Sequence, residues 1–307
     1  MAVPSSGALS LAGIRAELAT NTYNASATTQ ASLEDCSDGT VATINTANAS
    51  ADRPDGSAPH SMAEFYAYDH DLTSFTDNIS FDFDGTNDYL DFQQGNIGTD
   101  LEAIGSISVW VKLDSMSANG FIWQIKAEEG TDDQIILLWN NAAGVIRGNV
   151  KFGGTANVVD SGSGLENDGN WHHVAMTWES GSKTSANNIV RIYIDGSQTD
   201  SDAIGNSWGN ASGHAGFIIG RNEIQSNAYF NGHMNDIAFF SDVLTSSEVS
   251  AIYNSGSPKD ESDHSGLIAY YTMEAYSDSD TTLADDAGNS KTLRINNSTN
   301  IDSTDTP

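Results

Sequence analysis

Paired carboxylates are the first residues to examine for catalysis. Hydrolysis of a glycosidic bond uses two carboxyl groups, about 5 Å apart in retaining enzymes, with one as nucleophile and one as acid. The sequence has no Glu-x-Asp-x-x-Glu pattern that would place such a pair on one strand. Glu128-Glu129 and Asp132-Asp133 are adjacent pairs at a predicted turn, which separates their side chains. Serine, histidine and aspartate are scattered, without a nucleophile elbow. We therefore expect no catalytic residues and a protein that is not an enzyme.

Aromatic side chains in polar loops are candidates for stacking on a sugar ring. Trp208 lies in the segment Gly-Asn-Ser-Trp-Gly-Asn, which its composition predicts to be a loop. Asn206 and Asn210 flank it and could bond to hydroxyl groups, and Tyr229 is a second aromatic candidate. The further candidates are Trp139 and Asn227. The other tryptophans of the strand-rich region are expected in the core: Trp110, Trp123, Trp171 and Trp178.

The overall charge excludes two classes of partner. The 307 residues include 12 Lys and Arg against 42 Asp and Glu, which gives a net charge of −30. Nucleic acid and anionic membranes both repel such a chain. One cysteine, Cys36, allows no disulfide within the chain, and no apolar run is long enough to span a membrane. The N-terminal residues lack the pattern of a secretion signal, so we expect export by another route or release of a particle by lysis.

The elements that would position these residues are mostly strands. Between residues 74 and 256, short runs of apolar residues alternate with polar ones, as in 107–112 and 190–195, which is typical of half-buried antiparallel strands. The predicted strands are 79–84, 88–93, 105–113, 120–126, 133–140, 145–152, 156–160, 171–179, 189–195, 216–220 and 230–240. A helix is expected over 245–254, with Thr245 and Glu248 as a capping box. The pattern predicts an all-β, two-sheet sandwich or jelly roll.

The two ends of the chain differ from this central region. Residues 1–73 are small and polar, with one short helix predicted after Ser10 and an aromatic cluster over 62–68. We expect an extended arm that orders against a partner, with a disordered tail as the alternative. Residues 257–307 are expected to hold one strand pair at most, 267–273 with 293–295, and to end in a polar tail over 296–307.

Five segments in order resemble a known family. They are Phe-Asp-Gly-Thr-Asn-Asp-Tyr-Leu at 83–90, Ser-Ile-Ser-Val-Trp-Val-Lys at 106–112, Asp-Gly-Asn-Trp-His-His-Val-Ala at 168–175, Arg-Ile-Tyr-Ile-Asp-Gly at 191–196, and 230–240 with the helix that follows. Together they are similar to the laminin-G-like and pentraxin-like branch of the concanavalin A-like lectins. The resemblance covers about residues 79–295 and implies a jelly roll of two antiparallel sheets, so the domain is placed at 74–295. The strand 267–273 resembles the segment that opens such domains, which implies a permuted order.

The same resemblance implies calcium. In the pentraxin-like branch the ion is held by an acidic pair that opens a strand and by a polar group after a Leu-Gly pair. Here the implied ligands are Asp132, Asp133, Asn222 and Glu223. Arg221 brings a positive charge close, Ile224 stands where the family carries Asp, and solvated acidic loops are the alternative. A second possible ion site, or a simple turn, is formed by Asp84, Asn87 and Asp88.

The N-terminal residues resemble a different group. Ser-Leu-Ala-Gly-Ile-Arg-Ala-Glu-Leu at 10–18 and the stretch 58–66 are similar to segments of bacteriophage tail and appendage proteins. This implies a structural protein of a virion, in a tail, fibre or capsid appendage, that contacts other virion proteins through residues 1–73. Its lectin-like domain would bind host-surface glycan or neighbouring subunits, and analogy favours a homo-oligomer. The alternative is a free secreted or cell-surface bacterial adhesion protein that binds carbohydrate with calcium. A polysaccharide hydrolase is the least favoured reading.

Overall fold

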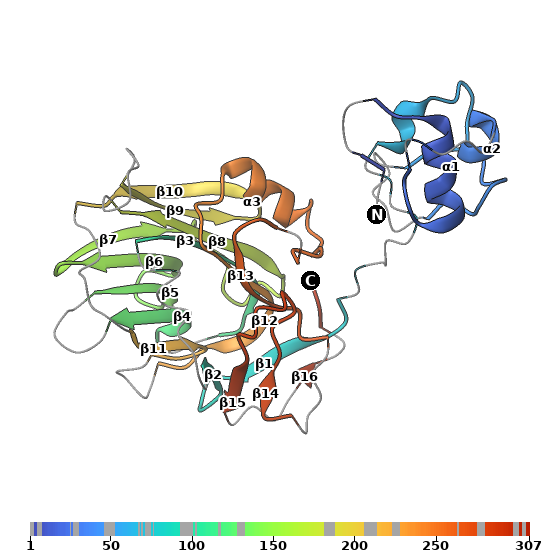
Figure 1. Ribbon diagram of the computed structural model, residues 1–307. Coiled ribbons are helices and arrows are strands. Elements are labelled where there is room, and N and C mark those ends of the chain that lie inside the picture. Colours follow the sequence, from blue (N-terminus) through green and yellow to red (C-terminus); the bar gives the residue numbers. More distant parts are fainter. Residues whose placement is uncertain are drawn as a thin grey trace. The chain divides into compact units, whose positions relative to one another are not determined.

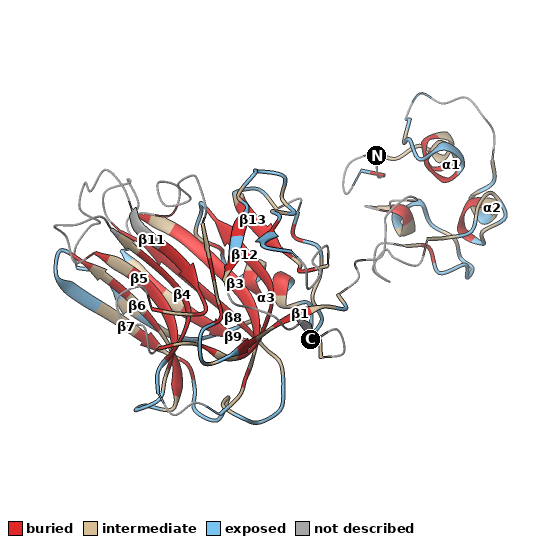
Figure 2. Ribbon diagram, turned by 90° about the horizontal axis from the view of Figure 1, so that it is seen from below, coloured by how far each residue is buried: buried red, intermediate tan, exposed pale blue. Residues whose placement is uncertain are grey.

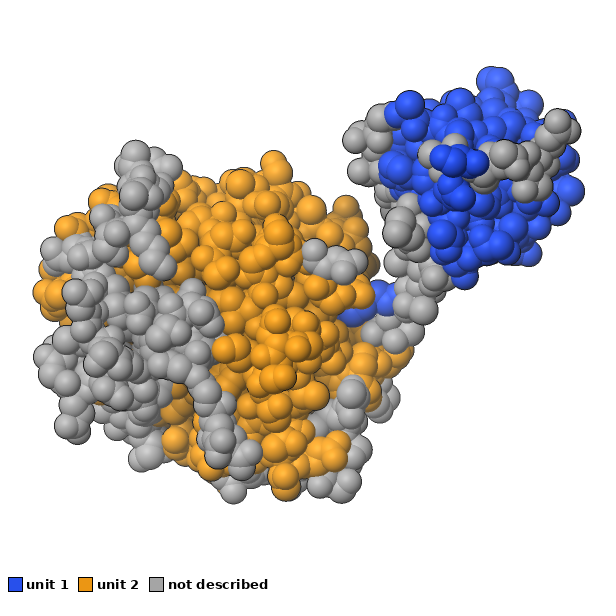
Figure 3. Space-filling view, in the orientation of Figure 1, with its two compact units in different colours: residues 1–76 blue, residues 77–307 orange. Residues whose placement is uncertain are grey.

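The chain forms two compact units, residues 1–76 and 77–307 (Figure 3). The computed structural model describes residues 3–4, 8–24, 26, 31–45, 53–66, 68, 70, 75, 77–92, 101, 103–115, 118–127, 133–180, 188–205, 214–222, 228–262, 264–274, 280–296, 301–302 and 305–307. Among these residues, no helix is both long and apolar enough to cross a membrane.

The N-terminal unit contains more helix than the sequence predicts. Its helices are α1 (Leu11–Thr20), α2 (Leu33–Ser37) and a 3₁₀ helix (Met62–Phe65). As predicted, α1 begins at Ser10, whose side-chain oxygen accepts a hydrogen bond from the Gly13 N–H at 3.0 Å. It ends at Asn21 in the left-handed conformation, which asparagine tolerates well.

A small core holds this unit together, so the expectation of an extended arm with one helix was wrong. The core side chains are Val3, Ile14, Leu18, Cys36, Phe65 and Tyr68. The phenol oxygen of Tyr68 accepts a hydrogen bond from the Asn45 N–H at 2.7 Å, which ties the ends of the unit to its middle. Ile14 and Leu18 have helical spacing on α1, but the other members are far apart along the unit and only the fold brings them together.

Residues 77–307 form two eight-stranded sheets whose strand pairs are antiparallel (Figure 1). The first sheet has the order β10-β9-β8-β3-β12-β1-β16, and β13 also pairs with β12. Its strands are β1 (Ser80–Asp84), β3 (Ile104–Leu113), β8 (His172–Glu179), β9 (Ile189–Ile194), β10 (Ser197–Ala203), β12 (Asn231–Phe240), β13 (Leu267–Tyr271) and β16 (Ile301–Asp302).

The second sheet has the order β14-β15-β2-β11-β4-β5-β6-β7. Its strands are β2 (Tyr89–Phe92), β4 (Gly120–Ala127), β5 (Gln134–Asn140), β6 (Val145–Phe152), β7 (Thr155–Asp160), β11 (His214–Ile219), β14 (Thr282–Leu283) and β15 (Leu293–Asn296). The two sheets enclose one apolar core, and most strand residues are buried (Figure 2). Trp123 of one sheet stacks on Trp178 of the other, with ring centroids 5.7 Å apart. The predicted all-β sandwich is confirmed.

Helix α3 (Ser246–Tyr253) covers part of the outer face of the first sheet. Thr245 and Glu248 form the predicted capping box. The ring of Tyr253 stacks on Trp110, with centroids 5.8 Å apart, and lies 6.0 Å from His173. The helix therefore buries His173, although this residue points away from the core between the sheets.

The structure contains strands that the sequence pattern does not predict. β10 has the polar sequence Ser-Gln-Thr-Asp-Ser-Asp-Ala, and a tight turn with positive φ at Asp195 and Gly196 folds it back on β9. The C-terminal region holds β13, β14, β15 and β16, where one pair at most was expected, and β16 lies within the predicted polar tail. β1 and β13 pair with successive parts of β12, on the side away from β3.

Candidate functional site

The outer face of the second sheet carries an apolar cluster separate from the main core. Its members are Phe121, Ile136, Leu138 and Ala228, and each is at most 6 % exposed. Alternation places them there, since a strand presents successive side chains to opposite faces and Leu137 and Trp139 face the core. These side chains are buried, so the cluster is a packed apolar layer on the outer side of the sheet and not an exposed patch.

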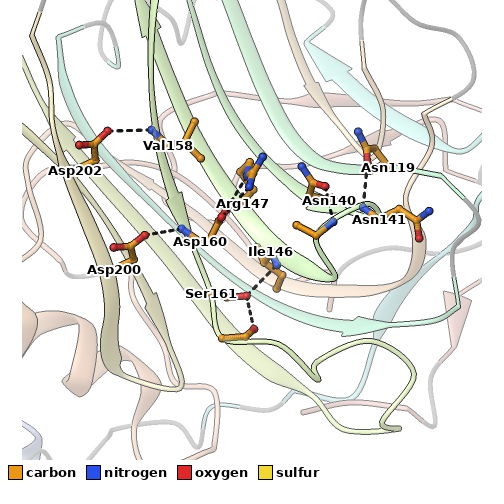
Figure 4. A network of polar contacts seen from close by, with 12 residues as sticks. Asn119, Asn140, Asn141, Ile146, Arg147, Val158, Asp160, Ser161, Asp200 and Asp202 are labelled. Carbon is orange, nitrogen blue, oxygen red and sulfur yellow. Dashed lines mark hydrogen bonds and ion pairs between the residues drawn. The ribbon is translucent and has the colours of Figure 1, made fainter.

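Register then sets charged side chains beside this cluster. Phe121 pairs with Leu138, Leu138 with Arg147, and Arg147 with Asp160, so the four side chains form one row across β4, β5, β6 and β7. Arg147 donates from Nε to Oδ1 of Asp160 at 2.6 Å and from Nη2 to Oδ2 at 2.7 Å (Figure 4). These bonds raise the pKa of Arg147 and hold its guanidinium in one orientation. The row therefore passes from apolar to polar groups over a short distance.

A second row offers neutral hydrogen-bonding groups. Gln124 pairs with Ile136, and Ile136 with Asn149. Gln124 donates from Nε2 to Oε1 of Gln134 at 3.1 Å. The side-chain oxygen of Asn149 is buried and has no hydrogen-bond partner among the described residues. This acceptor can serve a ligand hydroxyl or a water.

Carboxylates of β10 hold the edge strand that carries Asp160. Oδ2 of Asp200 accepts the Asp160 N–H at 3.0 Å, and Oδ2 of Asp202 accepts the Val158 N–H at 3.3 Å (Figure 4). β10 belongs to the first sheet, so these bonds close the sandwich at this edge and cap β7 groups that would otherwise face solvent. The polar sequence of β10 has its explanation here.

Amide side chains gather at the neighbouring turn. Oδ1 of Asn119 accepts the Asn141 N–H at 3.0 Å, and Oδ1 of Asn140 accepts the Ala143 N–H at 3.1 Å (Figure 4). Both bonds use the amide oxygen, which leaves the two donor N–H groups of each side chain out of these contacts. The turn joins β5 to β6 close to the Leu138–Arg147 pair, since Asn140 comes two residues after Leu138.

The described members of the predicted calcium set do not meet. Asp133 is buried, and its Oδ1 accepts the Gly153 N–H at 2.6 Å. It precedes Gln134, which pairs with Lys126 at the end of β4, whereas Asn222 follows β11 near the start of β4. Since β4 has eight residues, the two lie on the order of 20 Å apart along the sheet and do not fit one ion. Asp132 and Glu223 lie outside the described residues.

The other predicted ion site has the geometry of a turn. Oδ1 of Asp84 accepts the Thr86 N–H at 2.7 Å and the Asn87 N–H at 3.2 Å, and Oδ2 of Asp88 accepts the Asp84 N–H at 3.1 Å. Within the part of the chain that the structure describes, no group of three or more His, Cys, Asp or Glu residues has the arrangement of a metal site.

The predicted sugar-binding residues have different outcomes. Trp208, Asn206, Asn210 and Asn227 lie outside the described residues. Tyr229 forms a β-bridge with Arg221, whose guanidinium lies 3.7 Å above the ring of Tyr89, so two tyrosines and an arginine gather at the end of β11. Trp139 is 1 % exposed within the main core and is not a surface residue.

Comparison with known proteins places the fold. The family model described as the concanavalin A-like lectin/glucanases superfamily matches residues 84–250, more than half of the chain. The chain belongs to this superfamily. The resemblance read from the five segments is therefore confirmed at the level of the family.

Individual relatives of the superfamily are distant. The rat "Sushi, von Willebrand factor type A, EGF and pentraxin domain-containing protein 1" is 27 % identical over 186 residues, which span 58 % of this chain and 5 % of that protein. A candidate carbohydrate binding protein from Bacteroides ovatus has a TM-score of 0.55 at 20 % identity, over 76 % of this chain and 62 % of that one. A heptameric SAP-like pentraxin from Limulus polyphemus has a TM-score of 0.50 at 16 % identity, over 71 % and 94 %. The chain thus spans less than two thirds of the length of the rat protein and of the Bacteroides ovatus protein. At these identities, the two structural similarities show a shared fold and no more.

The sequence of β6 by itself indicates a polar face on the second sheet. In Val-Ile-Arg-Gly-Asn-Val-Lys-Phe, the segment of β6, alternation puts Arg147, Asn149 and Lys151 on one face. The pairing of Arg147 with Asp160 depends on the register of two strands, which alternation alone does not give.

Proposed function

We propose that residues 77–307 form a carbohydrate-binding module that uses the outer face of the second sheet. The observation that carries this proposal is the solvent-accessible Arg147–Asp160 pair, which lies in register with the buried Phe121 and Leu138. Beside it lies the Asn149 oxygen, which has no hydrogen-bond partner among the described residues. Sugars present an apolar C–H face and a rim of hydroxyl groups, and binding sites match them with apolar surface and a few fixed polar groups. Membership of the superfamily and the likeness to the Bacteroides ovatus protein support the same class of ligand.

The ion pair suits two adjacent hydroxyl groups. Arg147 retains N–H donors and Asp160 retains oxygen lone pairs after their mutual bonds form. One hydroxyl can donate to Asp160 while its neighbour accepts from Arg147. Their side chains are 27 % and 35 % exposed, so a ligand can reach both. The row holds one carboxylate, whereas glycoside hydrolysis uses two, which favours binding without cleavage.

Residues 1–76 are proposed to attach the module to a larger assembly. The similarity of 10–18 to phage tail and appendage segments favours a virion, with host-surface glycan as the ligand and a homo-oligomer as the displayed form. The unit has its own small core, which suits an independent attachment unit. Among the described residues, Met62 is the one large apolar side chain that is exposed, at 41 %. Met62→Glu should reduce incorporation into purified phage particles, measured by mass spectrometry. Absence of the wild-type chain from particles would favour a free bacterial adhesion protein instead.

A glycan array with the full chain tests the binding function. Arg147→Met should lose most binding to any glycan that the wild-type chain retains. Arg294→Met is the matched control, because Arg294 forms the same kind of cross-strand pair with Asp91 on the same sheet, at 2.8 and 2.5 Å. Equal loss in both variants, or none in Arg147→Met, would contradict the proposed site. The array is run with calcium and again with a chelator, and loss on chelation would show that glycan binding depends on a divalent cation.

A further inference from the structure

Four side chains lie abreast on the outer face of the first sheet. β1 pairs Asp82 with His233, and β12 pairs His233 with Lys112. Trp171 stands at the same level on the next strand, since it precedes the residue that pairs with Val111. The alternate residues of these strands face the main core, so this row points away from it.

Two N–H donors of this row, from Lys112 and Trp171, converge on the Asp305 carboxylate, and a histidine ring lies close to it. Nζ of Lys112 lies 2.5 Å from Oδ2 of Asp305, and the indole Nε1 of Trp171 donates to Oδ1 at 2.9 Å. Nε2 of His233 lies 3.8 Å from Oδ2 of the same group. Burial opposes the charge of Asp305, yet the bonds from Lys112 and Trp171 hold its pKa below the usual value. The two donors come from β3 and from the residue before β8, and each bonds to one oxygen of the carboxylate, with the His233 ring close by on β12.

This convergence is unusual for a chain of this charge. Acidic residues outnumber Lys and Arg by 42 to 12, so the chain as a whole repels anions. An anionic ligand needs a local set of donors that overcomes this repulsion, and Lys112, Trp171 and His233 form such a set. The rings of Trp171 and His233 lie 6.0 Å apart and are tilted by 52° to one another, and the half-buried indole offers an aromatic surface next to the donors.

Asp305 follows the short strand β16, which lies at the edge of the first sheet. Two residues of β16 pair with β1, and the Ser80 hydroxyl donates to the Asp305 carbonyl oxygen at 2.7 Å. The side chains of Lys112 and Asp305 are 20 % and 24 % exposed, so solvent reaches the contact. A two-residue strand at the edge of a sheet opens locally at low free-energy cost.

We propose that Lys112, Trp171 and His233 form a binding site for the carboxylate of an acidic saccharide such as a uronic acid, and that Asp305 occupies this site when no ligand is bound. The inference rests on the proposed carbohydrate binding but uses the opposite sheet. A ligand carboxylate takes the two oxygen positions of Asp305, and its sugar ring lies against the indole. The apparent dissociation constant is the intrinsic one divided by the fraction of molecules in which Asp305 has left the donors, so a tenfold effect requires Asp305 to occupy them about nine-tenths of the time.

Asp305→Asn tests this competition. The amide keeps an oxygen that can accept from the Trp171 N–H, and the bond from Ser80 to the main-chain oxygen of residue 305 is unchanged. However, the amide has no negative charge, and its N–H groups replace an oxygen next to Lys112. The probes are the tetramer of β-1,4-linked glucuronic acid and cellotetraose, which has the same linkage without carboxylates. By calorimetry, the full-length variant should bind the acidic tetramer about tenfold or more tightly than the wild-type chain does. Its affinity for cellotetraose should not change.

Lys112→Met in the Asp305→Asn background should abolish that gain, and thermal unfolding of each variant shows that the fold persists. An unchanged affinity of Asp305→Asn for the acidic tetramer would overturn the inference and make Asp305 an anchor for the C-terminal segment. An equal gain for cellotetraose would also overturn it. Failure of the proposed function is seen separately, because Arg147→Met acts on the second sheet and should leave the gain in Asp305→Asn intact.

Discussion

Nδ1 of His172 lies 3.0 Å from Oδ2 of Asp195, and Nε2 of the same ring lies 3.0 Å from Oδ2 of Asp168. An imidazole held between two carboxylates is stabilised in its charged form. The hydrogen bond to Asp195 is the main cause, and the pKa of His172 is raised above its usual value of 6.5. The side chain is 12 % exposed, so solvent screens the contact only in part.

His172 therefore stabilises the fold most at acidic pH. A group with a raised pKa in the folded state contributes fully below its unfolded pKa, and the contribution is lost as pH rises through the raised value. His172→Gln should cost about 1–2 kcal/mol at pH 5.5 and clearly less at pH 9. Urea unfolding of both proteins at the two pH values measures this difference. An equal cost at both pH values would mean that the ring acts without its charge.

Asp236 also makes the fold less stable as pH rises, but through burial of a carboxyl group instead of an ion pair. Its Oδ1 accepts a hydrogen bond from the Tyr270 hydroxyl at 2.8 Å, while its Oδ2 is buried without a partner among the described residues. Burial, and next the charge of Asp77, raises its pKa well above the usual value. The folded state thus holds a proton that the unfolded state releases, so stability falls as pH rises above the unfolded pKa of 3.8.

Asp236→Asn should remove this loss of stability. The amide keeps the acceptor for Tyr270, brings an N–H donor for neighbouring oxygens, and tolerates the positive φ of this position. We expect about 1–2 kcal/mol of stabilisation at pH 8 and little at pH 4. Urea unfolding at both pH values checks it. A variant that is less stable at pH 8 would show that the negative charge is needed, for instance by a bound cation.

Gly148 marks a place where the two sheets approach closely. A Cβ added there would lie 2.6 Å from Sδ of Met176 and 2.9 Å from Cγ2 of Val159. Gly148→Ala should cost about 1–3 kcal/mol, because it overpacks the core. Gly162→Ala is the control, since no atom lies within 4 Å of the added Cβ and its φ is not positive. Thermal unfolding compares the two, and equal midpoints would contradict the packing argument.

Cys36 reports on the N-terminal unit alone. It is buried in that core, and burial is the main cause that raises the pKa of its thiol. Since the thiolate is the reactive form, labelling by a thiol reagent should be slow in native buffer and fast in denaturant. The labelling rate across a urea series gives the opening of residues 1–76 without any mutation. Complete labelling within the mixing time in native buffer would contradict a stable core around Cys36.

Most of the sandwich could be predicted from alternation and turn residues. The strands Ile104–Leu113 and Val145–Phe152 lie within a residue or two of their expected bounds. The helix Ser246–Tyr253 follows from its capping box. Strand β10 could not be predicted this way, because its contacts are edge pairing with β9 and carboxylate caps on β7, and neither leaves an apolar pattern.

The sequence by itself determined the fold class and superfamily, because both depend on local alternation, turns and short segments that can be read along the chain. The tertiary structure alone decided which polar residues meet. Arg147 and Asp160 lie 13 residues apart, and Lys112 and Asp305 lie 193 apart. Their contacts depend on strand register and strand order, and a shift of one residue would send each side chain to the other face. Strand register and strand order also keep Asp133 and Asn222 apart, although the resemblance to the pentraxin-like branch implied that both would bind one ion.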